Sequence, residues 1–546
     1  MKLQFPLLFL FALCLYGCGA NHDNKKDNTV LSIGQYKLTS NDLEWQRKGD
    51  RYKALSTQAL EEKLVQNGEI LAYALDHRYD TIKALNKLLD YASRAYATSN
   101  DGFIFNKKVK PKLELTENDL KSAYQKRTQQ FVLEVIQISD KALLDKYYTS
   151  AKDFDALKEK VSSGKSGQVF TAPSRFPNVP LSVYINNVEN AKVGDVLGPV
   201  ETEDGYLVVR VAAIKPANQN PFEQEKEGIR QEVLSALTRK YAWANQKQVY
   251  DKADIKMNDD AILKIASSFN AQEKSWPGVD PDLVLMNYQL NGKSVTYRLA
   301  DFEEFVKNEP VFFGSVNNPN DVKKMLRYFI TEQYLFAEAQ QMNVQADEDY
   351  RQFRRNYQQK IFIEHFKRTL ILPKLSVQPQ ELEAYYGSHA GNYSVFGSAT
   401  VSMYKFKTFQ EAFRSRMALS RKLQGNPNQP VNNAAPKSVP LPEATVTEIK
   451  MNDPGNNPQL VNALLKLSPG QISSPINVNG EFLMISVAAK NGMTTLPFVY
   501  AKEQIKQIVH NQKEEQLIAQ TAKGLEAKYP VEQNSITAYL SQAEHK

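Results

Sequence analysis

Apolar residues that recur every three or four positions predict helices with one buried face. Two such stripes stand out along the chain: Leu60, Leu64, Leu71 and Leu75, and then Ile229, Val233, Leu237 and Tyr241. Asn220-Pro221 provides an N-cap and a first-turn proline for the second helix. Helix packing accounts for both stripes, so we interpret them as hydrophobic core.

Apolar runs rich in β-branched residues predict strands elsewhere in the chain. Residues 133–138 and 206–211 have this pattern, and the segment 154–157 between them is helical in character. Pro199 and Asp204-Gly205 predict a turn before the last strand. A mixed segment of strands and helices therefore lies between the helical regions.

The pattern occurs twice. Near the end of the mixed segment, seven of the thirteen residues 221–233 return 276 positions later, where average composition would give about one match. At the same offset, 194–213 corresponds to 470–489. At an offset of 262, Pro111-Lys112-Leu113, Leu120, Tyr124 and Phe131 return as Pro373-Lys374-Leu375, Leu382, Tyr386 and Tyr393. The chain is therefore a duplication, and each repeat is a helical region, a mixed segment and a closing helix.

Composition shifts mark the boundaries of these parts. The expected domains are a signal peptide 1–17, a tether 18–29, a first helical module 30–110, a first mixed domain 111–216, closing helices 217–268, a linker 269–282, a second helical module 283–372, a second mixed domain 373–491 with a low-complexity insertion 424–440, and a C-terminal helix and tail 492–546.

Composition and charge then reduce the number of possible function classes. With 546 residues, 42% of them apolar, the chain is a multidomain globular protein of about three to five domains, and it has no internal apolar run long enough to span a bilayer. The net charge of +7 is spread over 68 basic and 61 acidic residues without a basic block. This mixed pattern favours a solvated surface, and we expect no nucleic-acid partner.

The N-terminus looks like an export signal. Lys2 precedes an apolar stretch, Phe5 to Tyr16, that is too short to span a membrane. Leu15-Tyr16-Gly17-Cys18 resembles a bacterial lipobox, which implies lipidation at Cys18 and anchoring in a membrane. An ordinary cleaved signal is the alternative. The polar tether that follows spans at most about 40 Å.

Cysteine usage excludes several chemistries. The chain has two cysteines, Cys14 and Cys18, both in this leader, so a lipidated mature chain has no free thiol. Disulfides, thiolate nucleophiles and cysteine-ligated metals are thereby excluded. No His-Glu-x-x-His, Gly-x-Ser-x-Gly or Gly-x-Gly-x-x-Gly occurs, and Gly164-Lys165-Ser166 lacks the first glycine of a P-loop. We expect no metal, no nucleotide and no cofactor.

The mixed segments resemble the parvulin domain. Asp153-Phe154, the stretch 193–200 and Asp204-Gly205-Tyr206 look like the family's helix, glycine-proline turn and last strand, and 467–476 matches the turn more closely. A helical region before a parvulin domain and a long helix after it resembles the SurA, PrsA and PpiD-like periplasmic foldases. The resemblance implies an α+β fold: two tandem units, each a SurA-N-like helical module plus a parvulin-like α/β domain with a long closing helix.

Parvulin isomerases carry a histidine in the first strand and another in the last. The corresponding positions here read Val135-Ile136 and Ser402-Met403 in the first strands, and Leu207-Val208 and Leu483-Met484 in the last strands. We therefore expect no catalytic residue. The pockets would instead bind polypeptide through apolar and aromatic side chains, for which the candidates are Tyr124, Phe131, Tyr206, Leu207, Tyr386, Tyr393, Phe482 and Leu483.

Three hypotheses follow. The first is a lipid-anchored, ATP-independent chaperone that holds unfolded or nascent envelope polypeptides at the periplasmic face of the outer membrane, where Gly19 after the cysteine favours outer-membrane sorting. The second is an active peptidyl-prolyl cis-trans isomerase. The third is a structural subunit of an outer-membrane assembly or secretion machine.

Overall fold

The computed structural model describes residues 28–544, except 49, 165–166, 178–183, 186–187, 203–204, 309, 424–441 and 479. Several expectations lie outside the described residues: the signal peptide 1–17, lipidation at Cys18, the tether up to residue 27, Lys165-Ser166, Asp204 and the insertion 424–440.

The chain divides into two compact units. The terminal unit comprises residues 1–40, 54–77 and 362–546, and the central unit comprises 41–53 and 78–361. Each unit contains one small three-stranded sheet with helices and one mixed domain with a four-stranded sheet. The predicted α+β class, with two tandem copies, is confirmed.

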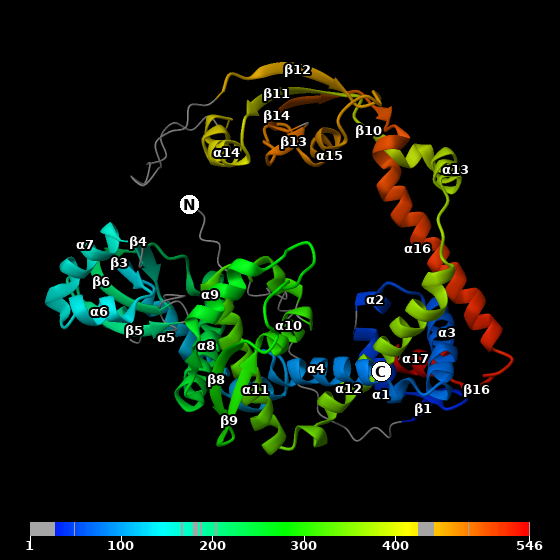
Figure 1. Cartoon of the computed structure of the whole chain (residues 1–546), viewed down its shortest axis with the longest axis horizontal. Helices are drawn as coiled ribbons and strands as arrows, with labels where there is room; N and C mark the ends of the chain where they lie inside the picture. Colours follow the sequence, from blue (N-terminus) through cyan, green and yellow to red (C-terminus); the bar gives the residue numbers. More distant parts are fainter. Residues whose placement is uncertain are drawn as a thin grey trace. The chain divides into compact units, whose positions relative to one another are not determined.

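Both ends of the described chain meet in the small sheet of the terminal unit (Figure 1). Its strand order is β16–β1–β2, where β1 is Thr29–Ile33, β2 is Tyr36–Thr39 and β16 is Val531–Asn534, all antiparallel. The backbone amide of Ser535 also donates to the carbonyl oxygen of Val30 at 2.8 Å. The C-terminal segment therefore completes the N-terminal module.

Helices α3 (Thr57–Asp76), α16 (Phe498–Leu525) and α17 (Ile536–Glu544) belong to the same module. Helix α3 packs against β1, β2, α16 and α17. Within α3, the predicted apolar stripe is confirmed, because Leu60, Leu64 and Leu71 are buried. At Gly68 a side chain would come within 2.8 Å of the Ile33 side chain, so glycine lets the helix approach the sheet closely.

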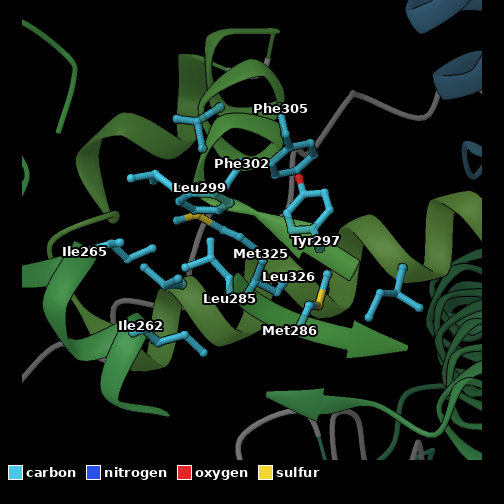
Figure 2. Packing of buried hydrophobic residues seen from close by; sticks show 14 of the residues in the cluster. Ile262, Ile265, Leu285, Met286, Tyr297, Leu299, Phe302, Phe305, Met325 and Leu326 are labelled. Carbon is cyan, nitrogen blue, oxygen red and sulfur yellow. The ribbon is translucent and has the colours of Figure 1, made fainter. Parts of the chain in front are cut away.

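The central unit builds a similar module within one stretch of chain. Its sheet has the order β7–β8–β9, from Lys256–Met257, Val284–Leu290 and Lys293–Arg298, and the helices are α9 (Asp259–Ser268), α10 (Leu299–Asn308) and α11 (Pro319–Gln341). Figure 2 shows the core between them, in which Leu285, Phe302 and Leu326 are fully buried.

The two modules share one construction. In each, a long helix leads into an edge strand and a short helix, α8 (Phe222–Ala253) into β7 and α9, and α16 into β16 and α17. The segment 269–282 belongs to the central module, because Trp276 is 4% exposed and its indole N–H donates to the carbonyl oxygen of Ile265 at 2.8 Å.

Helices α1 (Ser40–Lys48), α2 (Asp50–Lys53), α4 (Lys83–Thr98) and α12 (Glu348–Phe366) complete the helical part of the chain. The carboxylate of Asp42 is fully buried in the central unit, where it accepts a hydrogen bond from Gln352 at 2.5 Å and pairs with Arg355 at 3.4 Å. These partners offset the cost of burying that charge.

The mixed domains have equivalent antiparallel sheets, β4–β3–β6–β5 and β12–β11–β14–β13. The first contains β3 (Gln129–Ile138), β4 (Gly167–Arg175), β5 (Val196–Thr202) and β6 (Gly205–Pro216), with α5 (Glu117–Lys126), α6 (Lys141–Tyr147) and α7 (Phe154–Ser163). The sheet of the second contains β11 (Ser398–Phe406), β12 (Thr445–Lys450), β13 (Ile476–Val478) and β14 (Glu481–Asn491). Its helices are α13 (Pro379–His389), α14 (Phe409–Leu423) and α15 (Pro458–Lys466). A separate small pair consists of β10 (Ser394–Val395) and β15 (Thr494–Thr495). The predicted strands at 133–138 and 206–211 are confirmed.

The two sheets share even their irregularities. The central strand pair of each contains a bulge, after which Leu133 faces Val211 and Val401 faces Val487. The predicted glycine turn is present in both, since the amides of Gly194 and Gly470 each donate at 2.8 Å to those two valine carbonyls. Both glycines have positive φ, at +93° and +83°, which disfavours other residues.

This register corrects one detail of the sequence comparison. The first strands are related by an offset of 268, because Leu133 and Val401 occupy the same position. Phe131 therefore corresponds to Ala399, whereas Tyr393 lies before β10. The offset of 262 holds at Tyr124 and Tyr386 in α5 and α13, and the extra residues lie between these helices and the strands.

Candidate binding site

Tyr124 and Tyr386, two of the candidate binding residues, hold the closing helices in place. The hydroxyl of Tyr124 donates to the carbonyl oxygen of Asn220 at 2.8 Å, and that of Tyr386 donates to the carbonyl oxygen of Leu496 at 2.8 Å. Each acceptor directly precedes the proline at the start of a long helix, α8 or α16. The two tyrosines have the same structural role in both repeats.

The candidate residues Phe131 and Leu207 belong to the core of the first mixed domain. Phe131 is 1% and Leu207 is 7% exposed, and both pack in one cluster with the fully buried Val135. Val135-Ile136 and Leu207-Val208 are the strand positions where the resemblance to parvulin isomerases would place histidines, and of these Val135 and Leu207 face this core. Both side chains pack in this apolar core, where the register pairs Val135 with Val209 and Leu207 with Gln137 across β3 and β6.

The equivalent face of the second mixed domain is also apolar. Met403 is half-buried against the core there, Tyr393 lies in the same cluster, and Leu483 is 7% exposed. The histidines in the described part of the chain, His77, His365, His389 and His510, lie in helices or at a helix end and in neither sheet. Neither sheet can therefore provide a histidine pair.

The helix-covered face of the first sheet carries an ionic network beside its apolar core. Glu134 in β3 accepts from Lys158 of α7 at 2.6 Å and from Arg210 of β6 at 2.8 Å, and Arg210 also binds Asp155 at 2.9 Å. Partial burial opposes the charge of Glu134, but the hydrogen bonds from these two cations outweigh it and lower the pKa of the carboxyl group.

Tyr206, another candidate, is half-buried on this face. It packs against the cluster of α6 and α7, with the ammonium of Lys141 6.0 Å from its ring centre. The helix-covered face of the first domain is therefore filled by its own side chains, an apolar cluster and this ionic network.

The second domain differs at the same place. Ser402 and Ser486 form the cross-strand pair equivalent to Glu134 and Arg210, so the ionic network is absent from this pair of positions. The same domain carries an aromatic cluster, which we define as Phe409 and Phe413 of α14 with Phe482 of β14, the partner of Phe406 in the sheet. Phe409 stacks on Phe413 at 5.9 Å and meets Phe482 edge-on at 5.8 Å.

This aromatic cluster is open to solvent. Phe409 is 49% exposed and Phe413 is 58% exposed, while Phe482 is half-buried. Of the candidate residues, Phe482 is the one that the structure places beside exposed aromatic rings. Sequence reasoning missed Phe409 and Phe413, although their spacing of four marks one face of α14.

Other site types find no support in the described residues. Within the ranges that the structure describes, no group of three acidic, histidine or cysteine side chains could hold a metal ion. In the same ranges, no helix combines the length and the apolar character that a bilayer-spanning segment needs.

Comparison with known proteins agrees with this architecture. The PPIC-type PPIase domain family matches residues 115–227 and 377–503, that is, both mixed domains and the starts of their closing helices. The predicted resemblance to parvulin foldases is thereby confirmed.

Curated relatives match over part of their length. The foldase protein PrsA of Streptococcus equi subsp. zooepidemicus is 26% identical over 176 residues, which cover 30% of this chain and 52% of that protein. Foldase protein PrsA 1 of Streptococcus pyogenes is 24% identical over 170 residues, 29% of this chain and 48% of that protein. The chain thus spans about half the length of these relatives.

Solved structures give a similar result at lower identity. A SurA-like chaperone structure from Campylobacter jejuni is 15% identical and covers 45% of this chain and 98% of its own, with a TM-score of 0.24. A PrsA peptidylprolyl isomerase from Bacillus cereus is 16% identical and covers 43% of this chain and 88% of its own, with a TM-score of 0.13.

Proposed function

Because this chain carries two PPIC-type PPIase domains and is similar to PrsA foldases, we propose that it is a chaperone that holds unfolded polypeptides without catalysing prolyl isomerisation. The observation that carries the proposal is the exposed aromatic cluster of Phe409, Phe413 and Phe482, on a parvulin-type domain that lacks both histidines.

The cluster offers weak, unselective binding. A phenylalanine buries about 200 Å² on complete burial, so covering the exposed halves of Phe409 and Phe413 gains about 5 kcal/mol before the entropic cost of association. Such a contact suits a chaperone that releases its client without ATP. Several contacts of this kind on one chain would raise the overall affinity.

The apolar strand positions support binding rather than catalysis. Acceleration of prolyl isomerisation requires groups that stabilise the twisted amide better than the planar one. The side chains of Val135 and Leu207 in the first domain, and of Met403 and Leu483 in the second, offer no hydrogen-bond donor for this purpose. The match to the PPIC-type PPIase family is therefore the one observation that supports a second function as a prolyl isomerase.

Replacing Phe409 and Phe413 together by serine tests the proposal. We expect the double variant to need at least about threefold more protein than wild type for half-suppression of the aggregation of an unfolded β-barrel protein, because it loses most of the exposed aromatic surface. Light scattering measures the suppression, and circular dichroism checks the fold.

The matched control replaces two exposed aliphatic residues outside the cluster, Leu263 and Val446, by serine; they are 58% and 67% exposed. This control should behave as wild type. Equal suppression by the Phe409/Phe413 variant and wild type would contradict the proposal. A wild-type rate of Ala-Pro isomerisation well above the uncatalysed rate would contradict its non-catalytic part.

We further propose that the protein is anchored in the cell envelope through a lipid on Cys18, at the periplasmic face of the outer membrane, and that its clients are envelope polypeptides. The lipobox-like sequence and the polar tether support the anchor, and the extracytoplasmic role of such foldases supports the location. A structural role in an outer-membrane assembly machine is the alternative.

Replacing Cys18 by alanine should release the protein from membranes or leave it uncleaved, because no thiol is then available for the lipid. Fractionation and the mass of the N-terminal peptide measure this outcome, and a Cys14→Ala variant is the control. Wild-type membrane partitioning of the Cys18→Ala variant would contradict the anchor.

A further inference from the structure

A groove of about 1180 Å³ runs along the helical module of the terminal unit. Its walls come from α3, from the C-terminal part of α16 and the residues that follow it, and from the start of α17. Ligand pockets for small molecules measure about 300 to 1,000 Å³. The size and the open form of this groove suit an extended ligand.

The groove is strongly acidic. Its lining includes Glu61, Glu62, Glu69 and Glu526, against a single lining cation, Lys523. Glu61 is engaged in the fold, since it accepts from Asn534 at 2.7 Å and from the hydroxyl of Thr537, and Glu62 accepts from Gln58 at 3.0 Å. Glu69 and Glu526 are the acids left for a ligand.

Besides the acidic lining, the burial of Glu69 also points to a ligand. Its side chain lines the groove but is only 7% exposed, and no hydrogen-bond donor or cation reaches it from the part of the chain that the structure describes. Burial and the repulsion of Glu526 raise the pKa of Glu69 to about 7. A buried carboxyl group without a donor costs free energy, which a ligand cation would recover.

The rest of the lining indicates what kind of cation fits. The described residues hold no three-ligand metal cluster, which argues against a metal ion. Val65, Ala519 and Ala522 give the groove apolar walls, as the methylene stem of a lysine or arginine side chain requires while its charged end meets a carboxylate. The amides of Gln58 and Gln66 each make one hydrogen bond within the fold, to Glu62 and from Lys63, and keep further donor and acceptor capacity for a peptide backbone.

We propose that this acidic groove binds lysine- or arginine-bearing segments of unfolded polypeptides. This inference rests on the proposed chaperone function and names a class of client segment. The groove would then bind charged side chains of the client, whereas the aromatic cluster binds its apolar side chains. The attraction is electrostatic, so it weakens as ionic strength rises.

Fluorescence anisotropy of two labelled peptides tests the inference. In one peptide lysines alternate with alanines, and in the other glutamines replace the lysines. We expect wild type to bind the lysine peptide about tenfold more tightly at low salt, and the Glu69→Gln/Glu526→Gln variant to lose that preference. A Glu503→Gln/Glu515→Gln variant, with the same change of charge at exposed sites of α16 outside the groove, should keep it.

Three outcomes would overturn the inference: equal binding of both peptides by wild type, an unchanged preference in the Glu69/Glu526 variant, or complete competition by spermidine at matched charge, which would assign the groove to small polycations. The aggregation assay with wild type separates the two proposals. Suppression without a lysine preference overturns only the groove, whereas absence of suppression overturns the chaperone function itself.

Discussion

Replacing Ile536 by alanine is expected to destabilise the N-terminal module by about 3 to 4 kcal/mol, although the residue lies near the C-terminus. Ile536 is fully buried at the start of α17, which packs against α3 and β1. The cavity left by the side chain would weaken the contact that holds β16 and α17 on the module. Hydrogen exchange of the β1 amides, Thr29–Ile33, measures the effect, because these strands open with the module.

The equivalent helix of the central module supplies the control. Leu263 in α9 is 58% exposed, so Leu263→Ala should change stability by less than about 0.5 kcal/mol. Exchange of the β8 amides, Val284–Leu290, should stay unchanged in both variants, because β8 belongs to the other module. Wild-type protection of β1 in Ile536→Ala would show that the C-terminal segment does not stabilise the N-terminal module.

Replacing Glu69 by glutamine should increase the free energy of unfolding of the terminal unit at pH 8. At pH 5 the same substitution should give a much smaller increase. The pKa of Glu69 is raised from its ordinary 4.5 to about 7, first by burial and then by the charge of Glu526 on the residues after α16. The folded state therefore holds this proton more tightly than the unfolded state. The contribution of Glu69 to stability is therefore fully present below about pH 4.5 and is lost as pH rises through 7.

The expected gain in stability follows from the difference between the two pKa values of Glu69. One pKa unit corresponds to about 1.4 kcal/mol, so ionised Glu69 costs about 3 kcal/mol at pH 8, and the glutamine variant should recover most of it. Urea unfolding at both pH values, followed by a probe in the terminal unit, measures this difference. Glu503→Gln, at an exposed site of α16, is the control and should show no such pH dependence. Equal gains at the two pH values would contradict the raised pKa.

The duplication and the mixed domains could be predicted from the sequence. The strands at 133–138 and 206–211 and the glycine turns follow from local patterns, because strand period and turn residues act over a few positions. The missing histidines could be recognised as soon as the strands were placed. These features depend on residues close together in the chain.

Most candidate binding residues are buried in a core or hold a helix in place. The tyrosines at 124 and 386 hold helices, and Phe131, Leu207 and Tyr393 are core residues, because aromatic and aliphatic side chains look alike in a sequence whether they are buried or exposed. Phe409 and Phe413 have the same spacing as a core stripe. What distinguishes them is that no element in the described part of the chain covers them.

The sequence by itself determined that this chain is two copies of a parvulin-type unit without the histidine pair, since repeats, strands and residue identities are properties of the linear order. The tertiary structure decided that β16, which lies about 500 residues beyond β1, completes the N-terminal sheet, and that α3, α16 and α17 line one acidic groove. Pairing between distant segments depends on edges and faces that become complementary only once each part has folded, and no local pattern records it.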